Sequence, residues 1–404
     1  MDCSSIRCQT YNMSRDDPLI NRPGRPHFLV VLFGVLEYDG RVLRMVEVLS
    51  GLGDVTLVDV SRPGDTPGPV TDGIDRVHVQ LPAGVTKMAG HLRFWWAALK
   101  ACRRVKPNVV VAEDYFTAMP GWLSARLSRS HLIYDAHELI VPQAKERMVL
   151  RDRIWYLFER WVVPRAELVI AASPQRAAEM STHYHLTRAP EFMRNIPSQR
   201  YDAMDEGLLL ATYPCLMHRD ADERIILYQG HMALSRGIGR FLEAMAHLPT
   251  RFRLVLAGGG PDQERIAALV RQLRLSDRVI QLGRIPNRQL FAITRACDMG
   301  IVAYPIVGLN NIYCAPNKVF EYAQAGLPVI TTDQPPLKSM VERYQIGQCV
   351  GPEDPPGMIA KIIDEIAGRT KESYEVALAA FLDDHRWDNE AQRVRASIAH
   401  FALG

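Results

Sequence analysis

Two kinds of hydrophobic pattern alternate along almost the whole chain. Short apolar runs of strand length, such as 27–34 (HFLVVLFG) and 54–60 (DVTLVDV), are separated by stretches such as 42–52, where apolar residues recur at helical spacing. Further strands are predicted at 74–80, 108–112, 131–135, 168–172, 224–229, 253–257, 279–282, 299–303, 329–331 and 348–350. This alternation predicts an α/β fold in which helices cover both faces of parallel sheets.

The alternation is interrupted between residues 195 and 222, where prolines and a charged run replace the regular pattern. A chain of 404 residues is long enough for two domains. Ligands of open α/β sheets bind at the carboxyl ends of the strands, so two such domains facing each other would form a cleft lined by loops. We predict a disordered tail at 1–25, Rossmann-like domains at 26–200 and 201–385, and a helix at 386–404 that returns to the first domain.

Composition favours a cytoplasmic protein. The first 25 residues contain no apolar run long enough for a signal peptide, and no later segment reaches the length of a membrane span. The seven cysteines form no CxxC pair and are odd in number, which disfavours a disulfide framework or a structural zinc site. The formal net charge is only +3, and we expect no nucleic-acid partner.

The positive charge is concentrated in the segment 87–106, KMAGHLRFWWAALKACRRVK. It has six basic residues, no acidic residue, and three consecutive aromatic residues in its middle. Such a helix could lie on an anionic membrane surface, or it could pack its aromatic side chains into the core. In the first case the contacts would come from Lys87, Arg93, Trp95, Trp96, Arg103 and Arg104.

The segment 313–330, YCAPNKVFEYAQAGLPVI, predicts a loop, a short helix and a strand. Pro316 suits the first helical turn and Gly326 suits the C-terminal cap. The start of such a helix favours a phosphate group, and Glu321 could then accept hydrogen bonds from sugar hydroxyls. The alternative is a helix whose Glu321 is merely solvated.

Four loops that follow predicted strands carry further candidates. GHMALSRG at 230–237 places Arg236 at an expected anion site, whereas the glycine-rich turns 256–261 (LAGGGP) and 282–286 (LGRIP) are weak signals alone. His137, in YDAHEL, follows a strand end, where a titratable group is either functional or a satisfied structural histidine.

The order of these motifs resembles that of the retaining nucleotide-sugar glycosyltransferases of GT-B architecture, specifically family four. The resemblance extends from about residue 27 to residue 400. It rests on eight motifs in register: YDGRVLRMVEVLSGLGDVTLV, IYDAHEL, ELVIAASPQRAAEM, RNIP, YQGHMALSRGIGRFLEAM, LVLAGGGP, VIQLGRIPNRQL and APNKVFEYAQAGLPVI.

The resemblance implies roles for individual residues. Glu321 matches the carboxylate that holds ribose hydroxyls, Arg236 the cation that meets the diphosphate, and His137 the histidine beside the donor sugar. Donor contacts would come from Gly230, His231, Arg236, Gly259, Arg284, Ile285, Asn287, Tyr313, Pro316, Asn317, Lys318 and Glu321. Asp39, Gly40 and Arg41 match a signature in the loop expected to face donor phosphate and acceptor.

The implied reaction is transfer of a hexose from a nucleoside diphosphate, UDP or GDP, with retention of configuration and without a metal or other cofactor. Protein cations would neutralise the departing diphosphate. We find no obvious enzymic nucleophile, which favours same-face attack by the acceptor. Two departures affect donor binding: Tyr313 stands where most relatives have a second glutamate, and His231 where many have an arginine.

Three functional hypotheses remain open at this stage. The first is extension of a saccharide acceptor linked to a lipid such as polyprenyl diphosphate, for a surface polysaccharide, by an enzyme peripheral to the inner face of the cytoplasmic membrane. The second is transfer to a soluble acceptor. The third is a catalytically silent partner of another transferase, with Tyr313 as the lesion.

Overall fold

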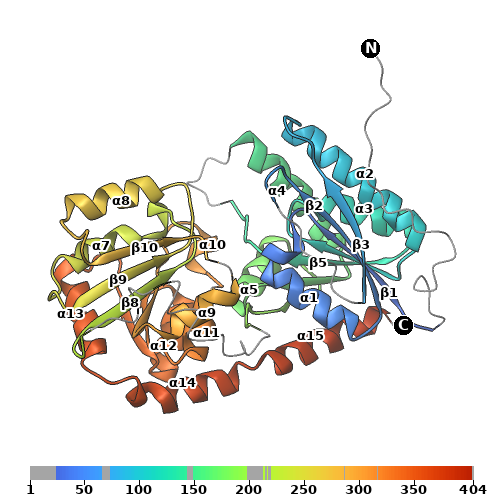
Figure 1. Ribbon diagram of the computed structural model, residues 1–404. Helices are drawn as coiled ribbons and strands as arrows, with labels where there is room; N and C mark the ends of the chain where they lie inside the picture. The colour runs from blue at the N-terminus through green and yellow to red at the C-terminus, as the bar shows by residue number, and fades with distance from the viewer. Residues whose placement is uncertain are drawn as a thin grey trace. The chain divides into compact units, whose positions relative to one another are not determined.

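The computed structural model describes residues 24–402, apart from 66–72, 143–148, 198–212, 214–215, 217–219, 286 and 316. The chain divides into two compact units (Figure 1). Unit 1 comprises Met1–Met193 and Glu390–Gly404, and unit 2 comprises Arg194–Asn389. The expected tail at 1–25 lies almost wholly outside the described residues.

Unit 1 is built on a seven-stranded parallel sheet with the order β3-β2-β1-β4-β5-β6-β7. The strands are β1 (His27–Leu32), β2 (Asp54–Ser61), β3 (Ile74–Gln80), β4 (Val109–Glu113), β5 (His131–Ala136), β6 (Leu168–Ala171) and β7 (Glu191–Phe192). The helices are α1 (Gly40–Ser50), α2 (Lys87–Val105), α3 (Ala118–Ser128), α4 (Leu150–Val162), α5 (Pro174–His183) and α15 (Trp387–Ala402), with 3-10 turns η1 (Leu36–Tyr38) and η2 (Val163–Arg165).

The central strands of this sheet are buried on both faces. Every residue of β1 and β4 is buried, as their continuous apolar sequences predict for a parallel sheet between two helical layers. Helix α2 packs on α3, and α3 packs on α4. The strand order reverses between β1 and β4, so the connections that follow these two strands lead to opposite sides of the sheet. Open α/β sheets bind ligands at such a point.

Unit 2 repeats the plan with a six-stranded parallel sheet of order β10-β9-β8-β11-β12-β13. Its strands are β8 (Arg224–Gln229), β9 (Phe252–Ala257), β10 (Val279–Gly283), β11 (Met299–Val302), β12 (Val329–Thr332) and β13 (Gly347–Val350). Its helical segments are η4 (Leu234–Arg236), α7 (Ile238–Met245), α8 (Gln263–Gln272), α9 (Asn287–Arg295), α10 (Leu309–Ile312), α11 (Lys318–Gln324), α12 (Pro335–Tyr344), α13 (Pro356–Ala367) and α14 (Glu372–Asp384).

The C-terminal segment of the chain belongs to unit 1. Within α15, Arg393 pairs with Glu191 of β7 and donates to the carbonyl of Phe192 at 2.7 Å, and the Ser397 hydroxyl donates to Glu191 at 2.8 Å. These contacts tie the last helix to the edge strand of the first sheet. The prediction that both domains are Rossmann-like and that the closing helix returns to the first is confirmed.

Candidate functional site

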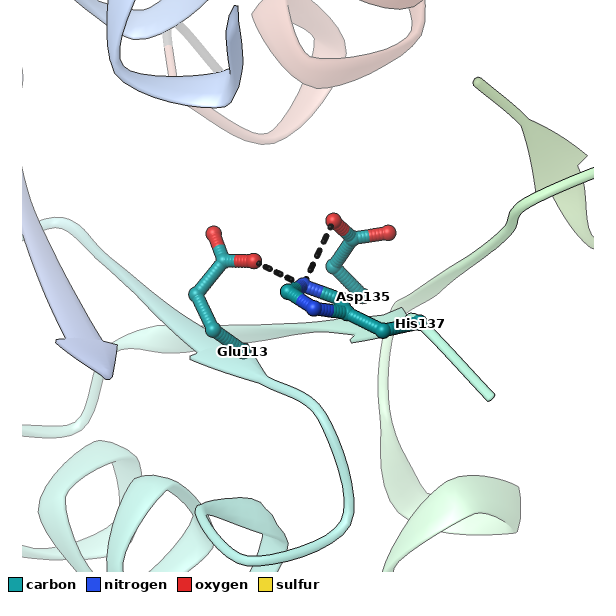
Figure 2. Close-up of side chains that lie close together, drawn as sticks. All are labelled: Glu113, Asp135 and His137. Atoms are coloured by element: carbon teal, nitrogen blue, oxygen red, sulfur yellow. Dashed lines mark hydrogen bonds and ion pairs between the residues drawn. The ribbon is translucent and has the colours of Figure 1, made fainter. Parts of the chain in front are cut away.

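The carboxyl ends of three strands in unit 1 bring together a cluster of titratable side chains. Asp39 follows β1 and caps α1, where its side chain accepts hydrogen bonds from the backbone N–H groups of Arg41 and Val42. Glu113 ends β4, and Asp135 and His137 lie at the end of β5 (Figure 2). Asp39 and His137 belong to different sequence motifs, and the sheet places both at one edge.

His137 is held between carboxylates on both sides of its ring. Nε2 lies 2.9 Å from Oε2 of Glu113 and 3.6 Å from Oδ2 of Asp135, and Nδ1 lies 3.5 Å from Oδ2 of Asp39. The dashed lines in Figure 2 mark the contacts of His137 with Glu113 and Asp135. The imidazole is mostly buried, and Glu113 and Asp135 are fully buried. Neighbours of opposite charge on two sides fix the ring orientation and favour the imidazolium.

The protonation states within the cluster follow from these contacts. Burial opposes a charge on His137, but its interactions with Asp135, Glu113 and Asp39 outweigh burial and raise its pKa well above the usual value. Burial, together with the charge of Asp135, raises the pKa of Glu113 to about 8. Burial would also raise the pKa of Asp135, but Arg41 and His137 overcome it and lower that pKa. Burial and the charge of Asp135 thus favour the protonated form of Glu113, whereas the carboxyl groups around His137 favour its imidazolium form.

Arg41 stabilises this cluster through its contacts with Asp135. Its guanidinium is buried and forms two hydrogen bonds with Asp135, of 2.9 and 2.5 Å, and further ones with the carbonyls of Met193 and Ala171. The sequence analysis expected Arg41 to face donor phosphate or acceptor. The structure instead turns its side chain inward, and Gly40 lies beside the side chain of Arg44. We therefore assign Arg41 a structural role.

Glu113, Asp135 and His137 also have ligand atoms close enough together to hold a metal ion. The charge of Asp135 is already compensated by the Arg41 guanidinium, which lies 2.5 Å away, so this carboxylate is not a free ligand. In the described part of the chain no other group of three such side chains meets the same distance criterion.

The second cluster lies at the switch point of unit 2, between β8 and β11. Oε2 of Glu321 in α11 accepts hydrogen bonds from Lys318 Nζ, at 3.0 Å, and from the amide of Gln229 at the end of β8. The Lys318 side chain also lies beside Gly230, at 3.9 Å from the position that a Cβ there would take. Within the described residues, Oε1 of Glu321 accepts no hydrogen bond, so this oxygen is available to a ligand hydroxyl.

The helix that carries Glu321 is fixed by its neighbours. Tyr322 is buried, its hydroxyl accepts a hydrogen bond from the backbone N–H of Gln229 at 3.2 Å, and its ring fills the space that a side chain at Gly300 would need. Gly326, with φ of 75°, ends the helix, and the N–H of Leu327 donates back to the carbonyl of Tyr322. The expected cap at Gly326 is therefore present, although α11 has only seven residues.

Glycines allow two strand-end loops of unit 2 to approach each other closely. A Cβ at Gly258 would lie 1.8 Å from the carbonyl oxygen of Gly230, and one at Gly260 would lie 2.4 Å from that of Met232. A Cβ at Gly259 would meet Arg284 at 2.8 Å. The weak LAGGGP signal thus has a physical cause, and it places Arg284 beside the glycine-rich turn.

Arg236 ends the turn η4 after β8, and its guanidinium lies over the ring of Tyr304 at 5.5 Å. In the part of unit 2 that the structure describes, no carboxylate pairs with Arg236, which leaves its charge available to an anion. His231 is exposed on the same loop.

The remaining donor candidates are partly accessible. Ile285, Tyr313 and Asn317 are half-buried near the strand ends of unit 2. Pro316 lies outside the described residues, as does the side chain of Asn287, although α9 begins at Asn287. The structure thus pairs Lys318 with Glu321, and it places the Lys318 side chain beside Gly230 and the Arg284 side chain beside Gly259.

The side chains of α2 divide between the core and the surface. Phe94 is fully buried, Trp95 is half-buried against Phe158 of α4, and Trp96 is 65% exposed. The cationic side chains proposed as membrane contacts are all exposed, and Arg104 among them pairs with Asp75 at 2.9 Å. Packing of the aromatic side chains into the core therefore holds for Phe94, whereas Trp96 is exposed.

Sequence reasoning missed several residues of these clusters. Glu113 lies one residue beyond the predicted strand at 108–112. Asp135 and Gln229 fall within the motifs IYDAHEL and YQGHMALSRGIGRFLEAM but were given no role there, and Tyr304 follows β11 outside every motif. A polar residue that interrupts a buried strand at its carboxyl end was the available signal for Glu113, Asp135 and Gln229.

The two Rossmann-like domains match the fold of GT-B glycosyltransferase structures. The family model for glycosyl transferases group 1 matches residues 218–376, and the model for the glycosyl transferase 4-like domain matches residues 40–192. The chain therefore belongs to the GT-B glycosyltransferases of the family 4 type.

Individual relatives are distant. The chain is 23% identical over 303 residues to a D-inositol 3-phosphate glycosyltransferase from Xylanimonas cellulosilytica, an alignment covering 68% of this chain and 64% of that protein. It therefore spans a little under two thirds of the length of that relative. HepE from Anabaena, solved in complex with UDP and glucose, superimposes with a TM-score of 0.71 at 15% identity over 93% of this chain and 100% of that one.

A second solved structure has the same fold. The sucrose-phosphate synthase of Thermosynechococcus elongatus superimposes with a TM-score of 0.69 at 21% identity, covering 94% of this chain and 100% of that one. At such identities the superpositions establish the fold alone. Among the described residues we find no helix that combines the length and the hydrophobicity needed to cross a bilayer.

Proposed function

We propose that the protein transfers a hexose from a nucleoside diphosphate sugar to an acceptor hydroxyl. The carrying observation is the cluster around Glu321, in which one carboxylate oxygen is held by Lys318 and Gln229 while the other has no partner among the described residues. Support for the donor class comes from HepE, which has been solved with UDP and with UDP-glucose. UDP or GDP is the expected nucleotide.

In this proposal unit 2 binds the nucleotide. Oε1 of Glu321 accepts hydrogen bonds from the ribose hydroxyls, while Arg236 and Lys318 neutralise the diphosphate. Negative charge grows on the diphosphate as the anomeric bond breaks, so fixed cations stabilise the transition state more than the ground state. Arg236 and Lys318 would supply this charge without a metal ion or other cofactor.

In unit 1, we propose that His137 positions a sugar substrate. The three carboxyl groups around His137 hold the ring in one orientation, which suits a residue that positions a substrate. We propose retention of configuration: the bond from the anomeric carbon to the diphosphate oxygen breaks, the acceptor oxygen bonds to the same face, and the acceptor proton passes to the departing phosphate.

The acceptor that we propose is a lipid-linked saccharide at the inner face of the cytoplasmic membrane, in the synthesis of a surface polysaccharide. The exposed cations and Trp96 of α2 favour this acceptor over a soluble one. Transfer to a water-soluble sugar at the same rate as to a lipid-linked one would favour the soluble alternative.

The donor site is tested by thermal-shift screening against UDP, GDP, ADP, dTDP and their hexose conjugates, with the Glu321→Ala variant in parallel. We expect stabilisation by one nucleotide family and its loss in the variant. Val376→Ala, a change at an exposed position of α14, is the matched control and should respond like the wild type. If no nucleotide stabilises the wild type, the silent-partner alternative replaces the enzyme proposal.

A further inference from the structure

Helix α4 exposes a stripe of large apolar side chains that the sequence analysis did not identify. Leu150, Ile154, Leu157 and Trp161 are 75, 38, 50 and 38% exposed, and their spacing of four, three and four residues places them on one side of the helix. The opposite side, with Trp155, Tyr156 and Val162, is buried.

Helix α2 exposes a second stripe. Met88, Leu92 and Trp96 are 64, 57 and 65% exposed and lie four residues apart, again on one side of the helix. The core side of α2 consists of Gly90, Phe94, Ala98 and Cys102 with their neighbours. Both helices therefore have a complete buried face and, in addition, an apolar exposed one.

The two helices meet through aromatic contacts. His91 and Trp95 of α2 lie 4.6 and 6.0 Å from Trp155 and Phe158 of α4, measured between ring centroids. We call the exposed side chains of α2 and α4 together the α2–α4 face. Monomeric proteins seldom gather so many exposed large hydrophobic side chains, and such surfaces usually contact a protein or a membrane.

The charge of this face distinguishes between those partners. Helices α2 and α4 carry exposed cations along their length: Lys87, Arg93, Lys100, Arg103, Arg104, Arg151, Arg153 and Arg160. Their acidic residues are Asp152, which pairs with Arg151, and Glu159, which is buried. Two copies of such a cationic face would repel each other, whereas anionic phospholipid headgroups complement it.

The face adjoins the strand ends that carry the His137 cluster. Its aromatic contacts continue to Phe33, which follows β1 and stacks on His91 at 4.0 Å, and to Phe116, which follows β4 and lies 5.1 Å from Trp155. The loop that contains Phe33 continues to Asp39, and the loop that contains Phe116 begins after Glu113. A surface held at a bilayer through α2 and α4 would keep this edge near the headgroups.

We propose that the α2–α4 face docks on the surface of an anionic phospholipid bilayer, with the apolar stripes in the headgroup region and the cations on the lipid phosphates. This inference rests on the proposed function, because docking would bring the proposed lipid-linked acceptor to His137. Docking of this kind differs from a membrane span, because only side chains enter the lipid.

Cosedimentation of the purified full chain with vesicles tests the docking. We expect binding to vesicles of phosphatidylcholine with about one third phosphatidylglycerol, and little binding to phosphatidylcholine alone. The variants Leu150→Ser/Leu157→Ser and Met88→Ser/Trp96→Ser should each weaken binding roughly tenfold or more. Val376→Ser, an equally drastic change at an 83% exposed position in unit 2, should bind like the wild type.

The cations are tested in the same assay. Lys100→Gln/Arg103→Gln should weaken binding roughly tenfold and reduce its salt dependence. The matched control is Arg271→Gln/Lys361→Gln, which removes two exposed charges from unit 2 and should have no effect.

The outcomes separate docking from catalysis. Wild-type protein that shows the nucleotide thermal shift but does not sediment with anionic vesicles overturns the docking proposal and leaves the proposed function intact. Wild-type protein that sediments with anionic vesicles but shows no nucleotide thermal shift overturns the proposed function and leaves the docking proposal intact. If the serine variants instead convert a dimer into a monomer in sedimentation velocity, the face is a protein interface and the proposal is wrong.

Discussion

Nε2 of His137 lies 2.9 Å from Oε2 of Glu113, while the second carboxyl oxygen of Glu113 is buried without a partner among the described residues. A carboxylate with one unsatisfied buried oxygen is costly, and protonation reduces that cost. The raised pKa of Glu113 and the raised pKa of His137 together mean that the folded protein retains protons here that the unfolded chain would release near neutral pH.

This retention predicts how stability depends on pH. The pKa of Glu113 rises from 4.5 to about 8 on folding, so the native state binds more protons than the unfolded state between these values, and the free energy of unfolding should fall as pH rises through this window. His137 acts in the same direction, since its stabilisation is fully present below 6.5 and is lost as pH rises through its higher folded pKa. Urea unfolding at pH 5.5, 7 and 8.5 measures the slope.

The variant Glu113→Gln isolates the carboxyl. Its amide resembles the protonated carboxyl in shape, so we expect nearly unchanged stability at pH 5.5 and a flatter decline toward pH 8.5. Glu375→Gln, which changes an exposed carboxylate in α14, should keep the wild-type slope. A wild-type slope in Glu113→Gln would show that Glu113 is ionised in the native protein.

The buried pair of Arg41 and Asp135 should be essential for the stability of unit 1. Replacing Arg41 by Met leaves Asp135 charged and buried, and breaking such a pair typically costs about 3–5 kcal/mol. Denaturant unfolding measures the loss. Arg151→Met, which removes an exposed partner of Asp152, is the control and should leave unfolding unchanged. Equal stability of the two variants would contradict the structural role of Arg41.

Arg236 should distinguish nucleoside diphosphates from monophosphates. We expect Arg236→Ala to weaken diphosphate binding roughly tenfold to a hundredfold, because a hydrogen bond to a charged group contributes about 1.5–3 kcal/mol. Monophosphate binding should change much less, and calorimetry with both nucleotides measures the difference. Arg265→Ala removes an exposed arginine of α8 as a control. An equal loss for both nucleotides would place Arg236 away from the β-phosphate.

Gly258 should tolerate no side chain. Its φ is 149°, and a Cβ would lie 1.8 Å from the Gly230 carbonyl oxygen, so Gly258→Ala must push apart the two loops that follow β8 and β9. We expect a stability loss of about 2 kcal/mol or more, together with weaker nucleotide binding. Gly357→Ala, where a Cβ meets nothing within 4 Å, should be neutral in both assays.

The strands of the fold could be predicted almost residue by residue, because buried parallel strands are continuous apolar runs. The predicted strand at 224–229 is β8, without any shift. The prediction at 74–80 also matches β3, although β3 is a half-buried edge strand whose sequence mixes apolar and polar residues. The two-residue strand β7 was missed because two residues form no pattern. Helix α4 was not predicted either.

The site could be predicted only where motif and position coincide. Glu321, Lys318 and Gly230 were identified from their motifs, and the structure brings them together. The inward turn of Arg41 could not be read from the sequence, because it depends on Asp135, 94 residues later, and on the carbonyl of Met193. Pairings of this kind follow from strand order, which the sequence alone does not state.

The return of α15 to unit 1 has a consequence for biosynthesis. On the ribosome, residues up to Met193 emerge well before Glu390. Arg393 and Ser397 can therefore contact Glu191, on the edge strand of the first sheet, only after all of unit 2 has been synthesised. Until then β7 presents an unpaired edge to other nascent chains. Unit 2, whose residues are contiguous, can complete its fold earlier, so the half of the molecule that is made first is the half that is finished last.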